Sequence, residues 1–286
     1  MLELLINPAK AEKRPWEMLF IGIFYGALSL LLTHWIFASD PVLSKYRGIL
    51  VVTFSVMFSL PFMYFAIKNE EEKDLQSDNL LRLLEEHGKA LTYFMFLFLG
   101  FVIAFSTWYI MFETGSESFT AQIETFCIIN RPTNFENCVN EYAEKMFSKT
   151  TSFSTARNKI VTIFANNMYV LIFTLIFSLI FGAGAIFILA WNASVISAAI
   201  GIFAKSEISK LPLGLARYMI HGIPEILAYF IGALAGGIVS IAIIKHDMKS
   251  EKFWIILQDS LNLIILAVIV LFIAALIEVF ITPVLF

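Results

Sequence analysis

The chain has 286 residues, of which 59% are hydrophobic and only 15% are charged, and its formal net charge is −3. This composition is far more apolar than that of a typical soluble domain, so it indicates an integral membrane protein. The charge balance argues against nucleic acid as a partner and against a polybasic contact with anionic lipid.

Apolar runs of about 20 residues recur along the chain, and this is the length that an α-helix needs to cross a bilayer. They predict an all-α fold, a polytopic transmembrane bundle of six to seven spans. The runs are Met18–Phe37, Ile49–Ile67, Leu91–Phe112, Ile160–Phe181, Ala185–Ala204, Glu225–Ile244 and Leu263–Thr282. The first run is too long for the core of a secretory signal, so we interpret it as a retained span. Only Gly182–Gly184 joins the fourth and fifth runs, which favours a tight antiparallel hairpin over one broken helix.

The spans and loops divide the chain into three predicted parts. Residues 1–112 hold three spans and a polar segment, 68–89, which we expect to form a cytoplasmic helical hairpin tip. Residues 113–159 form an external loop with little periodicity, and residues 160–286 form a C-terminal membrane core. The 20 Lys and Arg residues divide equally between the two predicted sides, so the positive-inside rule does not decide the orientation. The basic N-terminus favours a cytoplasmic N-terminus.

The only two cysteines, Cys127 and Cys138, lie in the predicted external loop. A disulfide between them would close a loop of about 12 residues and stabilise the fold by about 3 kcal/mol. Such a bond requires an oxidising compartment, which agrees with an external loop. Two unrelated free thiols are the alternative.

An ionisable pair, His221 and Glu225, lies at the start of the sixth apolar run, where each polar group needs a partner. Pro224 fits best in the first turn of a helix, so we expect the sixth span to begin there. Glu225 would then lie at the positive end of the helix dipole. Residues 211–220 would lie along the membrane interface and place His221 over the helix start.

Three asparagines add amide groups at the depth of the membrane, where they should face protein or trapped water. Our central structural hypothesis is one interior polar cluster formed by these asparagines together with the ionisable pair. Its members are Asn166, Asn167, Asn192, His221 and Glu225. The alternative for each asparagine is an ordinary hydrogen bond between two spans.

Small residues recur at intervals of four after Glu225, and such a stripe lets another helix approach closely. The expected helix-packing residues are Gly222, Pro224, Ala228, Gly232, Gly236 and Ser240. The stripe contacts either a helix of the same chain or a second copy, and a homodimer is the natural companion hypothesis.

The sequence carries no motif of a known catalytic or nucleotide site. It lacks a Walker loop, HExxH, GxSxG, a dinucleotide fingerprint and Cys/His metal spacing. His221 and Glu225 have no evident third ligand, so we expect no metal, no cofactor and no enzymatic activity. Asp259 and Glu278 lie near the ends of the last span, where we expect them to reach the headgroups.

Several residue patterns resemble the stage II sporulation protein M family. They are Asn166-Asn167, Asn192 with Gly201 downstream, and His221-Gly222 with Glu225 before a glycine-rich span. The N-terminal stretch Asn7–Trp16 is similar to the start of the archaeal branch of that family.

The resemblance implies a polytopic membrane protein without known catalytic activity. The family's namesake in spore-forming bacteria resembles a scaffold that recruits partner proteins, including cell-wall hydrolases, during engulfment. We therefore expect a multi-pass protein of the cell membrane, embedded in the lipid bilayer as a homodimer, that organises unidentified membrane or envelope proteins. The alternative is a transporter or channel for a small solute or ion, with the polar cluster lining its path.

Overall fold

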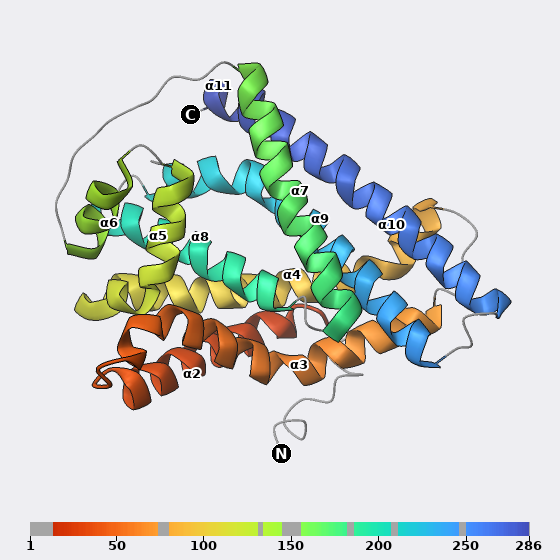
Figure 1. Cartoon of the computed structure of the whole chain (residues 1–286), viewed down its shortest axis with the longest axis horizontal. Helices are drawn as coiled ribbons and strands as arrows, with labels where there is room; N and C mark the ends of the chain where they lie inside the picture. Colours follow the sequence, from red (N-terminus) through yellow and green to blue (C-terminus); the bar gives the residue numbers. More distant parts are fainter. Residues whose placement is uncertain are drawn as a thin grey trace.

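The computed structural model describes residues 14–73, 80–130, 134–144, 156–181, 186–206, 211–245 and 250–285 (Figure 1). Within these ranges the regular structure is helical and no strand occurs, which confirms the all-α fold. Most of Asn7–Trp16 and the whole of Gly182–Gly184 lie outside the described residues. The long helices are α2 (Glu17–Phe37), α3 (Arg47–Lys73), α4 (Leu80–Met111), α7 (Ala156–Phe181), α8 (Ile186–Ser206), α9 (Leu211–Lys245) and α10 (Glu251–Leu276). The short elements are η2 (Leu43–Tyr46), η4 (Glu113–Phe119), α5 (Thr120–Asn130), α6 (Phe135–Glu144), η8 (Ile277–Ile281) and α11 (Thr282–Leu285).

In the part of the chain that the structure describes, seven helical segments are long and apolar enough to cross a membrane, which confirms the predicted polytopic bundle. Exposed aromatic residues mark both of its ends. Trp16 and Trp254 are 50% and 59% exposed near one end, and Trp35 and Tyr46 are 85% and 52% exposed near the other. Tryptophan and tyrosine gather at the two membrane–water interfaces, so their positions agree with a bundle that spans the bilayer.

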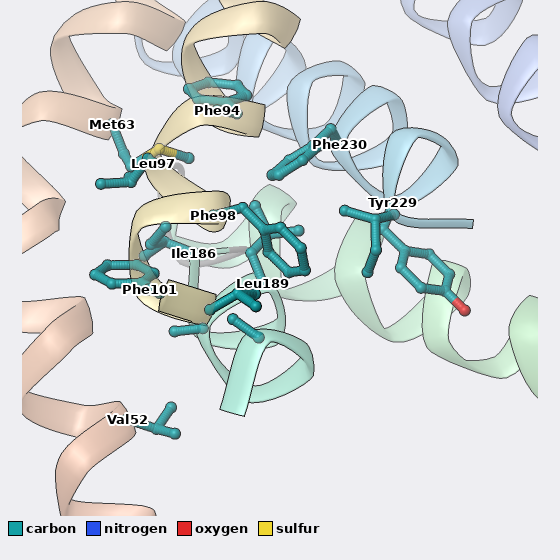
Figure 2. Close-up of a cluster of buried hydrophobic side chains, with 14 of the residues drawn as sticks. Val52, Met63, Phe94, Leu97, Phe98, Phe101, Ile186, Leu189, Tyr229 and Phe230 are labelled. Atoms are coloured by element: carbon teal, nitrogen blue, oxygen red, sulfur yellow. The ribbon is translucent and has the colours of Figure 1, made fainter. Parts of the chain in front are cut away.

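Helices α4 and α9 form the core on which the other spans pack. Helix α4 packs against α2 and α8, and α9 packs against α7 and α10. The two core helices meet through aromatic rings, because Phe230 of α9 lies 5.9 Å from the rings of both Phe94 and Phe98 of α4 (Figure 2). Helix α8 lies in the third predicted part of the chain, yet it packs on α4 of the first part. The three-part division itself stays a prediction.

Glycines set the close approach of α2 to α4. A Cβ atom added to Gly22 would lie 3.0 Å from the Cα of Gly100 and would collide with the carbonyl oxygen of Leu97. Close backbone contact compensates for the missing hydrophobic drive between helices in lipid.

Helix α9 differs from the prediction. It begins at Leu211 and contains Pro224, so the expected helix start at Pro224 is wrong, and residues 211–220 belong to the same helix. Proline removes one intrahelical N–H, but packing against neighbouring helices lets a membrane helix continue through such a residue. As a result, His221 and Glu225 lie one turn apart on a single face.

The helical pattern around the two polar segments was predicted in part. Helix α4 begins at Leu80, which confirms a helical extension of the third span, while residues 74–79 lie outside the described part. The long loop is more regular than predicted, because η4, α5 and α6 fill most of Glu113–Glu144.

Helix α7 packs along α9 and α10, and it meets α8 through the stacked rings of Phe177 and Phe187.

A buried ionisable pair joins α3 to α4 within the polar segment 68–89. His87 Nδ1 lies 2.6 Å from Glu70 Oε2, and the two side chains are 0% and 1% exposed. Neither residue was predicted as part of a site, because each lies in a polar segment that is typical of a solvated hairpin. The pair ties α3 to α4.

We predict that His87→Leu lowers the free energy of unfolding by about 3–5 kcal/mol, because it leaves the Glu70 carboxyl group buried without this partner. The double variant Glu70→Leu/His87→Leu should recover most of the loss, because it removes both polar groups. The exposed Lys89→Ala serves as the control. Denaturation of the detergent-solubilised protein measures the effect, and a double variant as unstable as His87→Leu would contradict the prediction.

Candidate functional site

Three side chains form a hydrogen-bonded polar cluster where α7 crosses α9. Asn167 of α7 donates its amide Nδ2–H to Glu225 Oε1 at 2.6 Å. The Tyr229 hydroxyl of α9 donates to Asn167 Oδ1 at 2.9 Å. One amide therefore uses its donor and its acceptor between two helices. Figure 2 shows the Tyr229 hydroxyl directed away from the apolar core, toward α7.

The C-terminal end of the last span lies beside this cluster. Segment η8 is a π-helical turn, and its Glu278 interacts electrostatically with Glu225 and Tyr229. Directly after η8 in the chain, Thr282 places its Oγ1 atom 3.4 Å from His221 Nδ1. Because π-turns within helices often occur at functional sites, this irregular turn supports the cluster as a candidate site. The expectation that Glu278 reaches the headgroups stays a prediction.

The site gathers ionisable groups at a depth where a lone ionised carboxylate is costly. Glu225 accepts a hydrogen bond from Asn167, and Glu278 adds a second carboxyl group nearby. Such a group can hold a proton, balance a small cation, or serve only to brace α7 against α9. Among the described residues, no three His, Cys, Asp or Glu side chains are arranged to hold a metal ion.

The other two predicted asparagines lie elsewhere. Asn166 is exposed on the outer side of α7, one residue from the inward-facing Asn167. Asn192 donates to the carbonyl oxygen of Ile188 at 2.7 Å, within its own helix α8. The described structure thus joins Asn167 directly to Glu225, and His221 approaches the same region through Thr282.

Sequence reasoning missed three members of this region: Tyr229, Glu278 and Thr282. Tyr229 lies one helical turn after Glu225, so a helix that continues from Glu225 places both on one face. Glu278 is the only ionisable residue of the run Leu263–Thr282, and that isolation was the available signal. Thr282 had no distinguishing pattern.

The small-residue stripe of α9 packs against α7 of the same chain. A Cβ atom at Gly236 would lie 2.8 Å from Ser178 Cβ and 3.0 Å from the carbonyl oxygen of Leu175. Ser178 Oγ also donates to the carbonyl oxygen of Ala233 at 2.6 Å. Close packing and an interhelical hydrogen bond therefore meet at one crossing.

The remaining stripe positions differ in their surroundings. Ala228 is fully buried and Ser240 is 7% exposed. A Cβ atom at Gly232 would collide with Leu171 of α7, whereas a Cβ atom at Gly222 would meet no atom within 4 Å. A homodimer would therefore need a surface other than the part of this stripe that α7 already fills.

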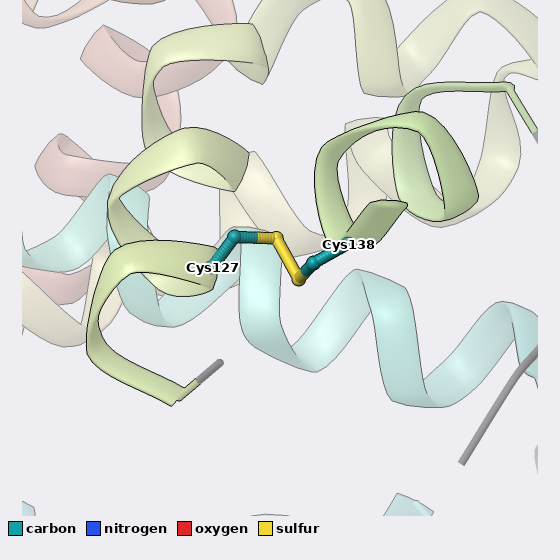
Figure 3. The surroundings of a disulfide bond; sticks show 2 residues. All are labelled: Cys127 and Cys138. Carbon is teal, nitrogen blue, oxygen red and sulfur yellow. A yellow bond between two sulfur atoms is a disulfide. The ribbon is translucent and has the colours of Figure 1, made fainter. Parts of the chain in front are cut away.

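A second candidate site is the disulfide lobe, which consists of η4, α5 and α6 (Glu113–Glu144). The structure joins Cys127 of α5 to Cys138 of α6 in a disulfide, with Cα atoms 5.8 Å apart (Figure 3). Gln122 of α5 is fully buried and donates to the Gly48 carbonyl oxygen and to Ser194 Oγ, each at 3.0 Å. The lobe is thus covalently closed and hydrogen-bonded to both α3 and α8.

Charged residues attach the same end of the bundle further. Arg47 of α3 lies 2.9 Å from Glu117 Oε2 of the lobe. Lys205 at the end of α8 donates to the Phe112 carbonyl oxygen at 3.2 Å, where a cation is favoured beside the C-terminus of α4. In the adjoining turn, the backbone N–H groups of Leu43 and Val42 lower the pKa of Asp40 by donating to its carboxylate.

We predict opposite effects for two glycine substitutions in α9. Gly236→Ala should lower the free energy of unfolding by about 1–3 kcal/mol, because its Cβ requires a shift of α7. Gly222→Ala should raise it by about 0.5–1 kcal/mol, because alanine favours the helix and space is open there. Thermal denaturation in detergent measures both values. If the two variants changed the free energy of unfolding equally, close packing against α7 would not be what disfavours alanine at position 236.

Comparison with known proteins gives one family. The family model described as Stage II sporulation protein M matches residues 18–283, a range that contains all seven candidate spans except the start of the first and the end of the last. Neither curated proteins nor solved structures give a match.

Proposed function

The chain belongs to the stage II sporulation protein M family, and from this premise we propose that it is a non-enzymatic membrane scaffold that organises partner proteins. Stage II sporulation protein M is not a known enzyme family. The observation that carries the proposal is the disulfide lobe, because it is a compact, covalently closed element fixed to the end of a membrane bundle. A fixed surface loses little conformational entropy when a partner binds it.

The exposed side of the lobe suggests the chemistry of a partner. Glu113, Glu124 and Glu136 are exposed there, and the apolar Ile128 is 58% exposed. An acidic surface with an apolar residue fits a partner surface that carries lysine or arginine around an apolar residue. We place the lobe on the outer side of the cell membrane, where a disulfide persists, and the N-terminus in the cytoplasm. The partners are then membrane or envelope proteins.

We predict that a photo-crosslinking residue at Ile128 gives discrete adducts with envelope proteins in native membranes. A crosslinker at the exposed Ile265 of α10 is the matched control, because it faces outward from a span. The charge-reversal variant Glu124→Lys/Glu136→Lys should reduce the Ile128 adducts while leaving the melting temperature unchanged, since both residues are exposed. The scaffold would be contradicted if charge reversal left the Ile128 adducts unchanged, or if the crosslinker at Ile265 gave the same adducts.

A transporter or channel is the second candidate function, and the neighbouring carboxyl groups of Glu225 and Glu278 are the observation that favours it. Intramembrane carboxyl groups commonly line ion or proton paths. This alternative predicts proton or sodium flux into proteoliposomes that Glu225→Gln abolishes. Absence of flux for both ions and for a panel of small solutes would leave only the scaffold.

A further inference from the structure

Helix α7 has the least buried span of the bundle. In its apolar segment 11% of the residues are buried, against 89% for α9. The buried side of α7, with Leu171, Thr174 and Ser178, faces its neighbours. Figure 1 shows α7 crossing the near side of the bundle, with α9 behind it. One long side of α7 is therefore available to the surroundings.

This outer side carries an amide where lipid tails are expected. Asn166 is exposed and Tyr169 is 70% exposed. The candidate span begins at Ile160, so at 1.5 Å per residue Asn166 lies about 9 Å and Tyr169 about 13 Å along the helix from its start. An amide that faces hydrocarbon without a hydrogen bond is penalised by several kcal/mol. The adjacent Asn167 avoids that penalty by pointing inward to Glu225.

Exposed residues on this side follow a regular spacing. Six of them form a row at steps of four, three, four, three and four, a spacing that lets two helices pack side by side, and the exposed Val161, Ile172 and Leu179 flank this row. The α7 seam consists of Thr162, Asn166, Tyr169, Phe173, Ile176 and Ile180. In such a seam, a single asparagine fixes register and the number of associating helices. Any exposed side of a helix shows such steps, but a lipid surface has no use for the amide.

We propose that the α7 seam is the interface of a homodimer, with Asn166 hydrogen-bonded to Asn166 of a second copy. Two copies share one orientation in the membrane, so a closed pair requires a two-fold axis along the membrane normal. The two α7 helices then run parallel, and each seam residue meets its own counterpart. An amide suits this arrangement because it has a donor and an acceptor, so two identical amides satisfy each other. This inference does not depend on the scaffold function.

The test uses full-length protein in liposomes with single introduced cysteines. The native sequence has only Cys127 and Cys138, which are joined to each other, so introduced thiols report alone. Phe173→Cys should form a disulfide-linked dimer rapidly. Ile172→Cys is the matched control, because it is exposed to 45% against 47% for Phe173 but lies off the seam. Faster crosslinking at Ile172 than at Phe173 would overturn the proposal, since that geometry leaves Asn166 in lipid.

A second measurement tests the asparagine itself. Fluorescence transfer between labelled copies gives the dimer dissociation constant as the protein is diluted in lipid. Asn166→Leu should weaken the dimer by about 3- to 15-fold, the range of interhelical hydrogen bonds in membranes. Its melting temperature should not fall, because Asn166 lies on the outer side of α7. A monomer at every dilution, or a dimer indifferent to Asn166→Leu, would assign this side of α7 to lipid or to another protein.

Discussion

A polar group within a membrane needs a hydrogen-bond partner that lipid does not supply, and the Asn167 amide meets this requirement for itself and two neighbours. It bonds Glu225 and Tyr229, which lie one turn apart on α9. The same α7–α9 crossing is packed closely where Gly236 meets Ser178. Because α7 buries so little apolar surface, these contacts determine where α7 lies and which of its sides faces outward.

The position of α7 connects the rest of the molecule. Glu225 and Tyr229 direct one face of α9 toward α7, while Phe230, on another face, packs on the rings of α4. The core helix α9 therefore links the polar crossing to the first three spans. At one end of the bundle, Gln122 fastens the disulfide lobe to α3 and α8. A partner that binds the lobe is thus held by a bundle whose parts are mutually braced, which is what a scaffold requires.

The sequence was sufficient to predict the spans, because a run of apolar residues has few alternatives to a membrane helix. It also identified Asn167 and Glu225, since polar groups at that depth need partners. It could not show which partner each would take. His221 was the partner suggested by its position four residues before Glu225, yet the hydrogen bond comes from Asn167, 58 positions away. Pro224 suggested a helix start because sequence alone carries no information about the helices that support α9 on either side.

A double-mutant cycle between Asn167 and Glu225 tests the central claim most directly. Unfolding free energies are measured in one detergent for the native protein, Asn167→Leu, Glu225→Leu and the double variant. The account predicts that each single variant is destabilised and that the two losses overlap by about 1.5–3 kcal/mol, as expected for a hydrogen bond to a carboxylate. Losses that add to within about 0.3 kcal/mol would contradict it, because the two side chains would then act independently.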